Sequence, residues 1–188
     1  MDWDKVKEDT YYKCRKLESD ARNDAEPNKW EEYADIKSIK GSYVLGIYGY
    51  MNAASLSEIK KEIDEAISYY KKAFKLAIKA EYKELVVILG YKMAQLYEQE
   101  KKWTDCITVY EEAAEFCDIQ GEHFLSADAY EHAAEMIALS GKDVSNYTKP
   151  IDLWKRNITH WEEEDHIHDA VWSREHIELY KKLFGIKK

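Results

Sequence analysis

The chain has 188 residues, of which 45% are hydrophobic, 13% are aromatic and 35% are charged, and its net charge is −9 at pH 7. This composition excludes a disordered chain, and seven Gly and two Pro are too few for an all-β or α/β fold. The acidic balance argues against general binding of nucleic acid, whose phosphates would be repelled. We therefore expect a single all-α domain over residues 1–188.

Apolar residues at three- and four-residue intervals predict a first helix over residues 3–21, ending before the first proline. A second helix is expected over residues 30–54, where the segment Tyr43–Met51 is apolar nearly all round. We expect Gly46 and Gly49, which weaken a helix, to let a neighbouring helix approach closely. An interface for self-association is the alternative for this segment, and core and interface both stay open.

The third helix is expected to begin at Ser55, because Ser55 and Glu58 have the spacing of a capping box, and to extend to Ala77. A fourth helix is expected over residues 82–100. The fifth helix follows a short turn, with Thr104 as a candidate N-cap.

The last four helices are separated mainly by glycines. We expect the fifth and sixth to end at Gly121 and Gly141, because glycine readily takes the left-handed conformation that follows a helix. The seventh helix is expected to carry Pro150 near its start, and the eighth to end at Gly185. The prediction is thus an all-α fold, a right-handed array of about four antiparallel helical hairpins.

A pattern in the third helix recurs forty residues later in the fifth. In both copies a small residue, an aromatic residue and a small residue share one helical stripe. The two sets are Ala66, Tyr70 and Ala73, and Cys106, Tyr110 and Ala113. Such a period is typical of stacked helical hairpins, whose exposed faces commonly bind other proteins.

The segment Val87–Gln120 resembles a tetratricopeptide repeat. Ala94 and Tyr97 match the small and aromatic positions of its first helix. Cys106, Tyr110 and Ala113, on the expected fifth helix, match those of its second. The usual Trp and the terminating Pro are absent, so the motif is partial.

The stretch Cys106–Glu135 is closer still to the soluble NSF attachment proteins, a subfamily with longer helices. Their hairpins combine an aromatic-Glu-x-Ala-Ala run, a Gly-Glu turn and a helix rich in small residues. Here these are Tyr110–Ala114, Gly121 with Glu122, and Ala127–Ala134.

This resemblance, which covers about residues 59–140, implies a non-enzymatic scaffold or adaptor in vesicle trafficking or complex assembly. It also implies a protein or peptide partner and no cofactor. The final Leu-Phe-Gly-Ile-Lys-Lys does not match the leucine-bearing tail with which attachment proteins engage their ATPase, so the membrane-fusion role is not carried over.

In tetratricopeptide arrays the first helix of each pair lines a groove, and residues beside the small–aromatic stripe face it. That resemblance selects six protein-binding residues on the fourth and sixth helices: Tyr91, Gln95, Glu98, Phe124, Asp128 and Glu131. Such a mixture suits a partner with basic and apolar side chains, and it lacks the pattern of a carboxylate clamp. A solvated polar face is the alternative for the set, and Phe124 also fits the core. Reversing the charges of Glu98 and Asp128 is expected to leave folding nearly unchanged.

The histidines carry the alternative function, a metal-binding helical-bundle enzyme. His160, Glu164 and His168 have the spacing i, i+4 and i+8, which would place them on one face of a helix. A complete site needs carboxylates from further helices, and only one such motif is present. We therefore expect no metal and no enzymatic activity.

The three cysteines, Cys14, Cys106 and Cys117, have no metal-binding spacing and favour reduced thiols in the core of a cytoplasmic protein. The glycosylation motifs at Asn146 and Asn157 are then chance matches. No apolar run reaches the roughly 18 residues of a transmembrane helix, so a soluble chain is expected. The sequence does not indicate an oligomeric state.

Overall fold

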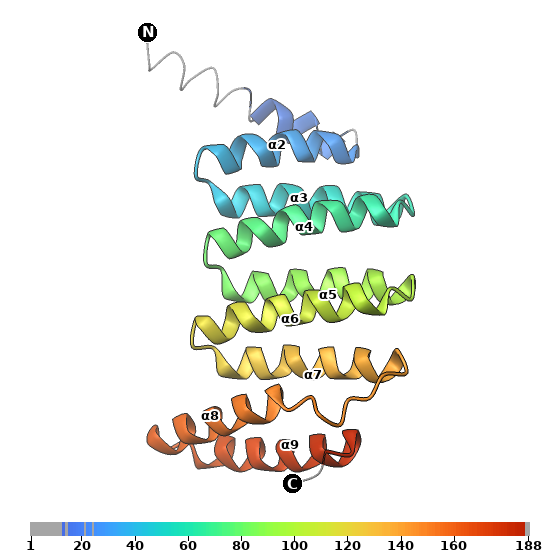
Figure 1. Cartoon of the computed structure of the whole chain (residues 1–188). Coiled ribbons are helices and arrows are strands. Elements are labelled where there is room, and N and C mark those ends of the chain that lie inside the picture. The colour runs from blue at the N-terminus through green and yellow to red at the C-terminus, as the bar shows by residue number, and fades with distance from the viewer. Residues whose placement is uncertain (1–12, 14, 21, 24, 187–188) are drawn as a thin grey trace. The chain divides into compact units, whose positions relative to one another are not determined.

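The computed structural model describes residues 13, 15–20, 22–23 and 25–186, among which there is no β-strand (Figure 1). The first predicted helix lies largely outside these residues, as does Cys14, but residues 15–20 are helical. The helices with described bounds are α2 (Pro27–Ile39), α3 (Tyr43–Ile59), α4 (Ile63–Lys79), α5 (Lys83–Gln99), α6 (Trp103–Ile119), α7 (His123–Leu139), α8 (Lys149–Glu163) and α9 (Ile167–Phe184). The predicted all-α repeat fold is confirmed.

The chain divides into two compact units, Met1–Leu89 and Gly90–Lys188, and α5 crosses the boundary. In the first unit, α3 packs between α2 and α4. In the second unit, α6 to α9 pack in chain order, each against the next. The organisation as one domain stays a prediction.

Five successive helices, α3 to α7, share one length and one period. Each has 17 residues, and each begins twenty residues after the one before, from Tyr43 to His123. The forty-residue recurrence is therefore two copies of a shorter unit, one helix with its turn.

Each turn in this series ends the preceding helix in the same way. Its middle residue has a positive φ and donates its N–H to the carbonyl three residues back, while the next N–H bonds the carbonyl five residues back. This is the Schellman motif. Gly121, with φ +77°, takes this conformation without a Cβ penalty, and the predicted helix ends at Gly121 and Gly141 are confirmed. The non-glycine residues at this position are Lys61, Glu81 and Lys101.

Replacing Lys101 by glycine is expected to raise the free energy of unfolding by about 1 kcal/mol. Lys101 has φ +55°, and a left-handed conformation is unfavourable for a residue with a Cβ by roughly that amount. Lys92, exposed in the middle of α5, is the matched control, because Lys92→Gly should lower stability by about 1 kcal/mol. Urea unfolding measures both variants, and a loss of stability in Lys101→Gly would contradict the expectation.

Three predicted helix boundaries are wrong. The helix expected over residues 30–54 is interrupted at Gly41, whose φ of +76° ends α2 before α3 begins. Ser55 and Glu58 lie inside α3 and do not cap a new helix, because the N–H groups there already bond within α3 and the chain turns at Lys61. Thr104 lies in the first turn of α6, whose N-cap is Lys102.

The glycines of α3 allow the close approach that the sequence predicts. A Cβ on Gly49 would lie 2.8 Å from the Cβ of Ala34 and 3.0 Å from the carbonyl oxygen of Trp30, so α2 packs directly on this face. The apolar segment is only partly core, however, because Val44, Leu45 and Tyr48 are exposed. Apolar as α3 is, none of the described helices is both long and apolar enough to cross a membrane.

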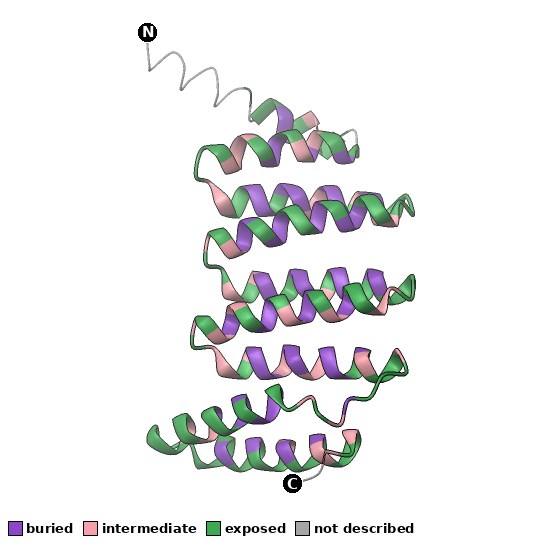
Figure 2. Ribbon diagram, viewed as in Figure 1, coloured by how far each residue is buried: buried purple, intermediate pink, exposed green. Residues whose placement is uncertain are grey.

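Small residues bring the helices of the second unit close together. The buried thiol of Cys106 donates to the carbonyl of Ala94, and twenty residues later Ser126 donates to the carbonyl of Ala114, at 2.7 Å. Figure 2 shows buried residues in stripes along these helices. Cys106 and Cys117 are buried and are not in a disulfide, as expected, and burial raises the pKa of Cys106 to about 11.

The twenty-residue period ends after α7. A longer loop leads to α8, which begins at Lys149 with Pro150 in its first turn, as predicted. The loop is fixed by Tyr147, which donates to Glu111 Oε1 at 2.7 Å and accepts from Tyr180 through its carbonyl oxygen at 2.9 Å. The loop therefore joins α6 to α9 within the second unit.

Candidate protein-binding surface

All six residues predicted to bind a partner lie in the second unit. On α5, Tyr91 is half-buried, whereas Gln95 and Glu98 are exposed. The three on α7 are Phe124, which is exposed, and Asp128 and Glu131, which are half-buried.

Tyr91 and Asp128 are brought together by a hydrogen bond from the phenol to the carboxylate. Burial, and then this bond, raises the pKa of Tyr91 above its ordinary value. The Tyr91 ring also contacts Tyr110 and His132 edge-on, with centroids 5.2 and 5.0 Å away. Asp128 is thus already engaged, so reversing its charge would remove the acceptor of this bond, and this argues against the expectation that folding stays nearly unchanged.

Phe124 belongs to a group of rings that we call the aromatic platform: Phe124, Trp154, Trp172 and His176. Phe124 stacks on Trp172 at 5.8 Å, and Trp172 stacks on His176 at 4.8 Å. Phe124 is 41% exposed and Trp172 is 45% exposed, so α7 and α9 present adjoining aromatic surface to solvent. The assignment of Phe124 to the core is therefore wrong.

Glu131 lies beneath the aromatic platform. Its carboxylate accepts a hydrogen bond from Trp154 Nε1 at 2.6 Å, and its other oxygen lies 2.7 Å from His176 Nε2. The side chain is only 16% exposed, and burial raises the pKa of Glu131 above its ordinary value. Glu131 therefore orients two rings of the platform.

Sequence reasoning missed Trp172 and His176. They share a stripe of α9 with Leu179 and Leu183, at spacings of four, three and four residues, next to the buried stripe that contains Ile177. Leu179 and Leu183 are exposed too. A second apolar stripe on one helix was the signal that could have found them.

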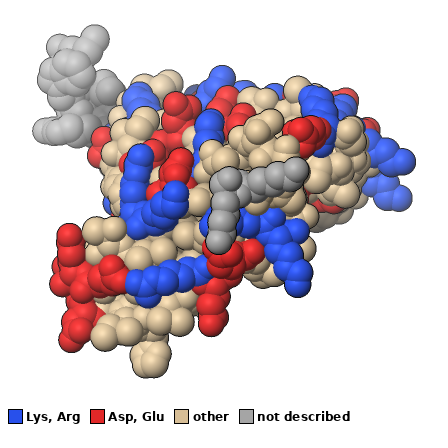
Figure 3. All heavy atoms as spheres, turned by 60° about the horizontal axis from the view of Figure 1, so that its bottom comes forward, with Lys and Arg blue, Asp and Glu red and all other residues tan. Residues whose placement is uncertain are grey.

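Acidic side chains lie next to the platform on α7, whereas charges of both signs occur over the molecular face in Figure 3. Lys and Arg side chains are interspersed with Asp and Glu side chains over the face in view in Figure 3, with uncharged areas between them. Next to the platform the carboxylates of Asp128, Glu131 and Glu135 follow one another on α7. Glu135 accepts a hydrogen bond from His132, which lowers the pKa of Glu135. The local charge on α7 is therefore negative.

The family model described as soluble NSF attachment protein, SNAP, matches residues 16–167. The chain belongs to the soluble NSF attachment protein family. This confirms the resemblance seen over residues 59–140 and extends it in both directions. A search of curated protein sequences finds no match. Membership in the family, whose helical repeats are similar to tetratricopeptide repeats, indicates a protein-interaction role in vesicle trafficking.

The geometry does not support the metal-binding alternative. Helix α8 ends at Glu163, and the turn through Asp165, with φ +61°, separates His160 and Glu164 from His168 on α9. The three side chains therefore do not share one helical face. Among the described residues no group of three His, Cys, Asp or Glu could hold a metal ion.

Proposed function

We propose that the protein is a non-enzymatic adaptor of vesicle trafficking that binds a protein or peptide partner on its second unit. Its family supports the adaptor role. The main support for this location of the binding site is the exposed, stacked pair of Phe124 and Trp172. Aromatic residues of this kind dominate the binding energy of many protein interfaces. The buried thiols of Cys106 and Cys117, neither of which is in a disulfide, support a cytosolic location.

The partner is a segment with basic and apolar side chains. Aromatic faces attract cations, and the nearby carboxylates of α7 add to that attraction. Leu179 and Leu183 extend the exposed apolar surface along α9 beyond the aromatic platform. An extended or helical segment carrying Arg or Lys beside Leu or Phe side chains complements both features.

The residues of α5 extend this surface in the proposal. Gln95 and Glu98 are exposed, so they are available for hydrogen bonds and ion pairs with the partner. Tyr91 and Asp128 hold each other by a hydrogen bond and contribute mainly their exposed edges. Glu131 contributes through the rings that it orients.

Replacing both Phe124 and Trp172 by alanine is expected to weaken partner binding by at least about thirtyfold, the effect of losing an interface hot spot. The main partner is identified by affinity capture from native lysate with quantitative mass spectrometry, and its affinity is then measured with purified components. Both rings are partly exposed, so circular dichroism should show an unchanged helical fold.

The matched control is a double variant with alanine in place of Leu139 and Ile167. These two apolar residues are exposed and lie elsewhere on the same two helices, α7 and α9. This control should bind the partner like the original chain. Equal binding by the Phe124 and Trp172 double variant would move the binding site off the aromatic platform. A main partner that is itself turned over as a substrate would contradict the adaptor role.

A further inference from the structure

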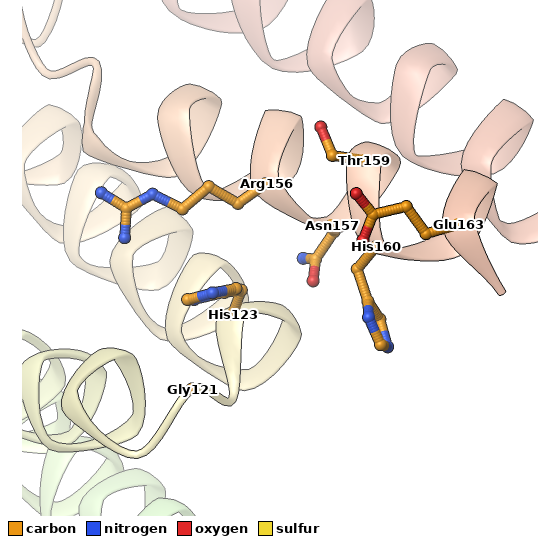
Figure 4. Close-up of a pocket in the computed structure, with 7 residues that line it drawn as sticks. All are labelled: Gly121, His123, Arg156, Asn157, Thr159, His160 and Glu163. Atoms are coloured by element: carbon orange, nitrogen blue, oxygen red, sulfur yellow. The ribbon is translucent and has the colours of Figure 1, made fainter.

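A concave site lies where α8 passes the turn between α6 and α7, and it does not include the aromatic platform. Its cavity volume is about 340 Å³. Figure 4 shows its lining residues, which come from the turn, the start of α7 and the second half of α8: Gly121, His123, Arg156, Asn157, Thr159, His160 and Glu163. We call it the α8 pocket.

Asn157 is the feature of the α8 pocket that points to a ligand. The residue is only 3% exposed, and its Nδ2 is the sole buried side-chain nitrogen or oxygen without a hydrogen-bond partner in the described part of the chain. Figure 4 shows its amide projecting from α8 toward the turn, between His123 and His160. Buried donors without acceptors are rare because they lose their bonds to water without replacement, so this N–H group is available for an acceptor.

The start of α7 supplies further unbonded donors. The first N–H groups of a helix have no acceptor within the helix. In α7 the first backbone N–H group that donates to a carbonyl four residues earlier is that of Ser126, which donates to Glu122. The side chain of the N-cap residue, Glu122, does not cap these N–H groups, and the first turn carries no acidic residue. This 17-residue helix therefore directs a partial positive charge toward the pocket end that contains His123.

The cationic side of the pocket is held in place by a carboxylate. Arg156 donates to Asp118 Oδ1 at 2.9 Å, and His123 Nδ1 lies 3.1 Å from the same oxygen. Arg156 keeps further N–H groups for a second acceptor. Thr159 does not compete for a ligand, because its hydroxyl donates to the carbonyl of Lys155 and points away in Figure 4.

We propose that the α8 pocket binds a phosphate group, with Asn157 Nδ2 and the first N–H groups of α7 as donors and Arg156 at the side. An oxyanion accepts several hydrogen bonds at once and is favoured by the positive end of a helix. Arg156 would then be shared between the phosphate and Asp118. The cavity is larger than a phosphate ion, so a phosphate monoester fits as well as free phosphate.

Titration with inorganic phosphate, followed by amide NMR of the full chain at constant ionic strength in chloride, tests this proposal. We expect saturable shifts of the Asn157 side-chain amide and of the backbone amides of residues 123–125, with a dissociation constant on the order of 1 mM. Phosphoserine as a second probe distinguishes the sources. Tighter binding of phosphoserine indicates a monoester as the ligand, and equal binding indicates free phosphate.

Asn157→Asp keeps the shape of the side chain but replaces its donor with a negative charge, and it should weaken phosphate binding by at least about tenfold. Asn146→Asp makes the same change at an exposed residue and should leave binding unchanged. If Asn157→Asp does not fold, Arg156→Gln, at a side chain 56% exposed, takes its place and should weaken binding several-fold. The proposal is overturned by an absence of saturable shifts, by equal binding in the variant and its control, or by acetate binding as tightly as phosphate.

Discussion

Replacing Trp154 by alanine is expected to lower the free energy of unfolding of the second unit by about 3–5 kcal/mol, the usual range for a buried tryptophan. Trp154 is 1% exposed and lies in one cluster with Ile151, Ile177 and Tyr180. The substitution leaves a cavity between helices and also removes the donor that bonds Glu131. Both effects lower stability.

Urea unfolding followed by far-UV circular dichroism measures this loss. Trp161→Ala is the matched control, because Trp161 is on the same helix but is only half-buried and contacts His160 and His166 near the end of α8. The control should lose much less stability than Trp154→Ala. Similar losses for the two variants would show that Trp154 does not anchor the core of this unit.

The helical repeat was predictable because its marker is local. Small residues at Ala66, Ala73 and Ala113 let helices approach, and Tyr70 and Tyr110 fill the space between them. The spacing of these residues along one helix is enough to recognise the pattern in the sequence. Burial confirms all five as core.

The twenty-residue unit was harder to find because three of its turns carry no glycine as a marker. Gly121 and Gly141 mark the left-handed residue that ends a helix. Lys61, Glu81 and Lys101 take the same conformation, although it is unfavourable for a residue with a Cβ. There the two backbone hydrogen bonds of the Schellman motif hold the turn. The capping-box pattern at Ser55 consequently resembles a helix start, although the turn lies six residues later, at Lys61, and carries no glycine.

The candidate surface was predictable only in part, for a related reason. The offset from the core stripe placed Phe124, Asp128 and Glu131 on one side of α7, but it carried no information on the neighbouring helices. Trp172 and His176, more than forty residues later in the chain, lie against Phe124 and Glu131. Because of such tertiary contacts, the carboxylate of Glu131 accepts hydrogen bonds inside the protein and does not lie free on the surface as the sequence predicts.

Glu131→Ala is therefore expected to lower the free energy of unfolding by about 3 kcal/mol, because two donors lose their acceptor and each unsatisfied group contributes about 1–3 kcal/mol. Those donors are Trp154 Nε1 and His176 Nε2. Glu112→Ala, at an exposed carboxylate on α6, is the control and should change stability by no more than about 0.5 kcal/mol. Equal effects in urea unfolding would exclude an internal role for Glu131.

Glu131→Gln separates the hydrogen bonds from the charge. Burial raises the pKa of Glu131 more than its bonds from Trp154 and His176 lower it, and the charge of Asp128 raises it further. The folded state thus holds the Glu131 proton more tightly than the unfolded state does. The resulting stabilisation is fully present below the unfolded pKa and is lost as pH rises through the folded pKa.

Glutamine keeps an acceptor for Trp154 and a donor for His176 but cannot ionise. We therefore expect Glu131→Gln to gain stability relative to the original chain as pH rises from about 4 to about 7, because only the original chain loses the stabilisation from its bound proton. Urea unfolding at both pH values measures the difference. If the variant instead loses stability relative to the original chain over this range, the ionised carboxylate is the favoured form beneath the aromatic platform, and its attraction to His176 outweighs the cost of burial.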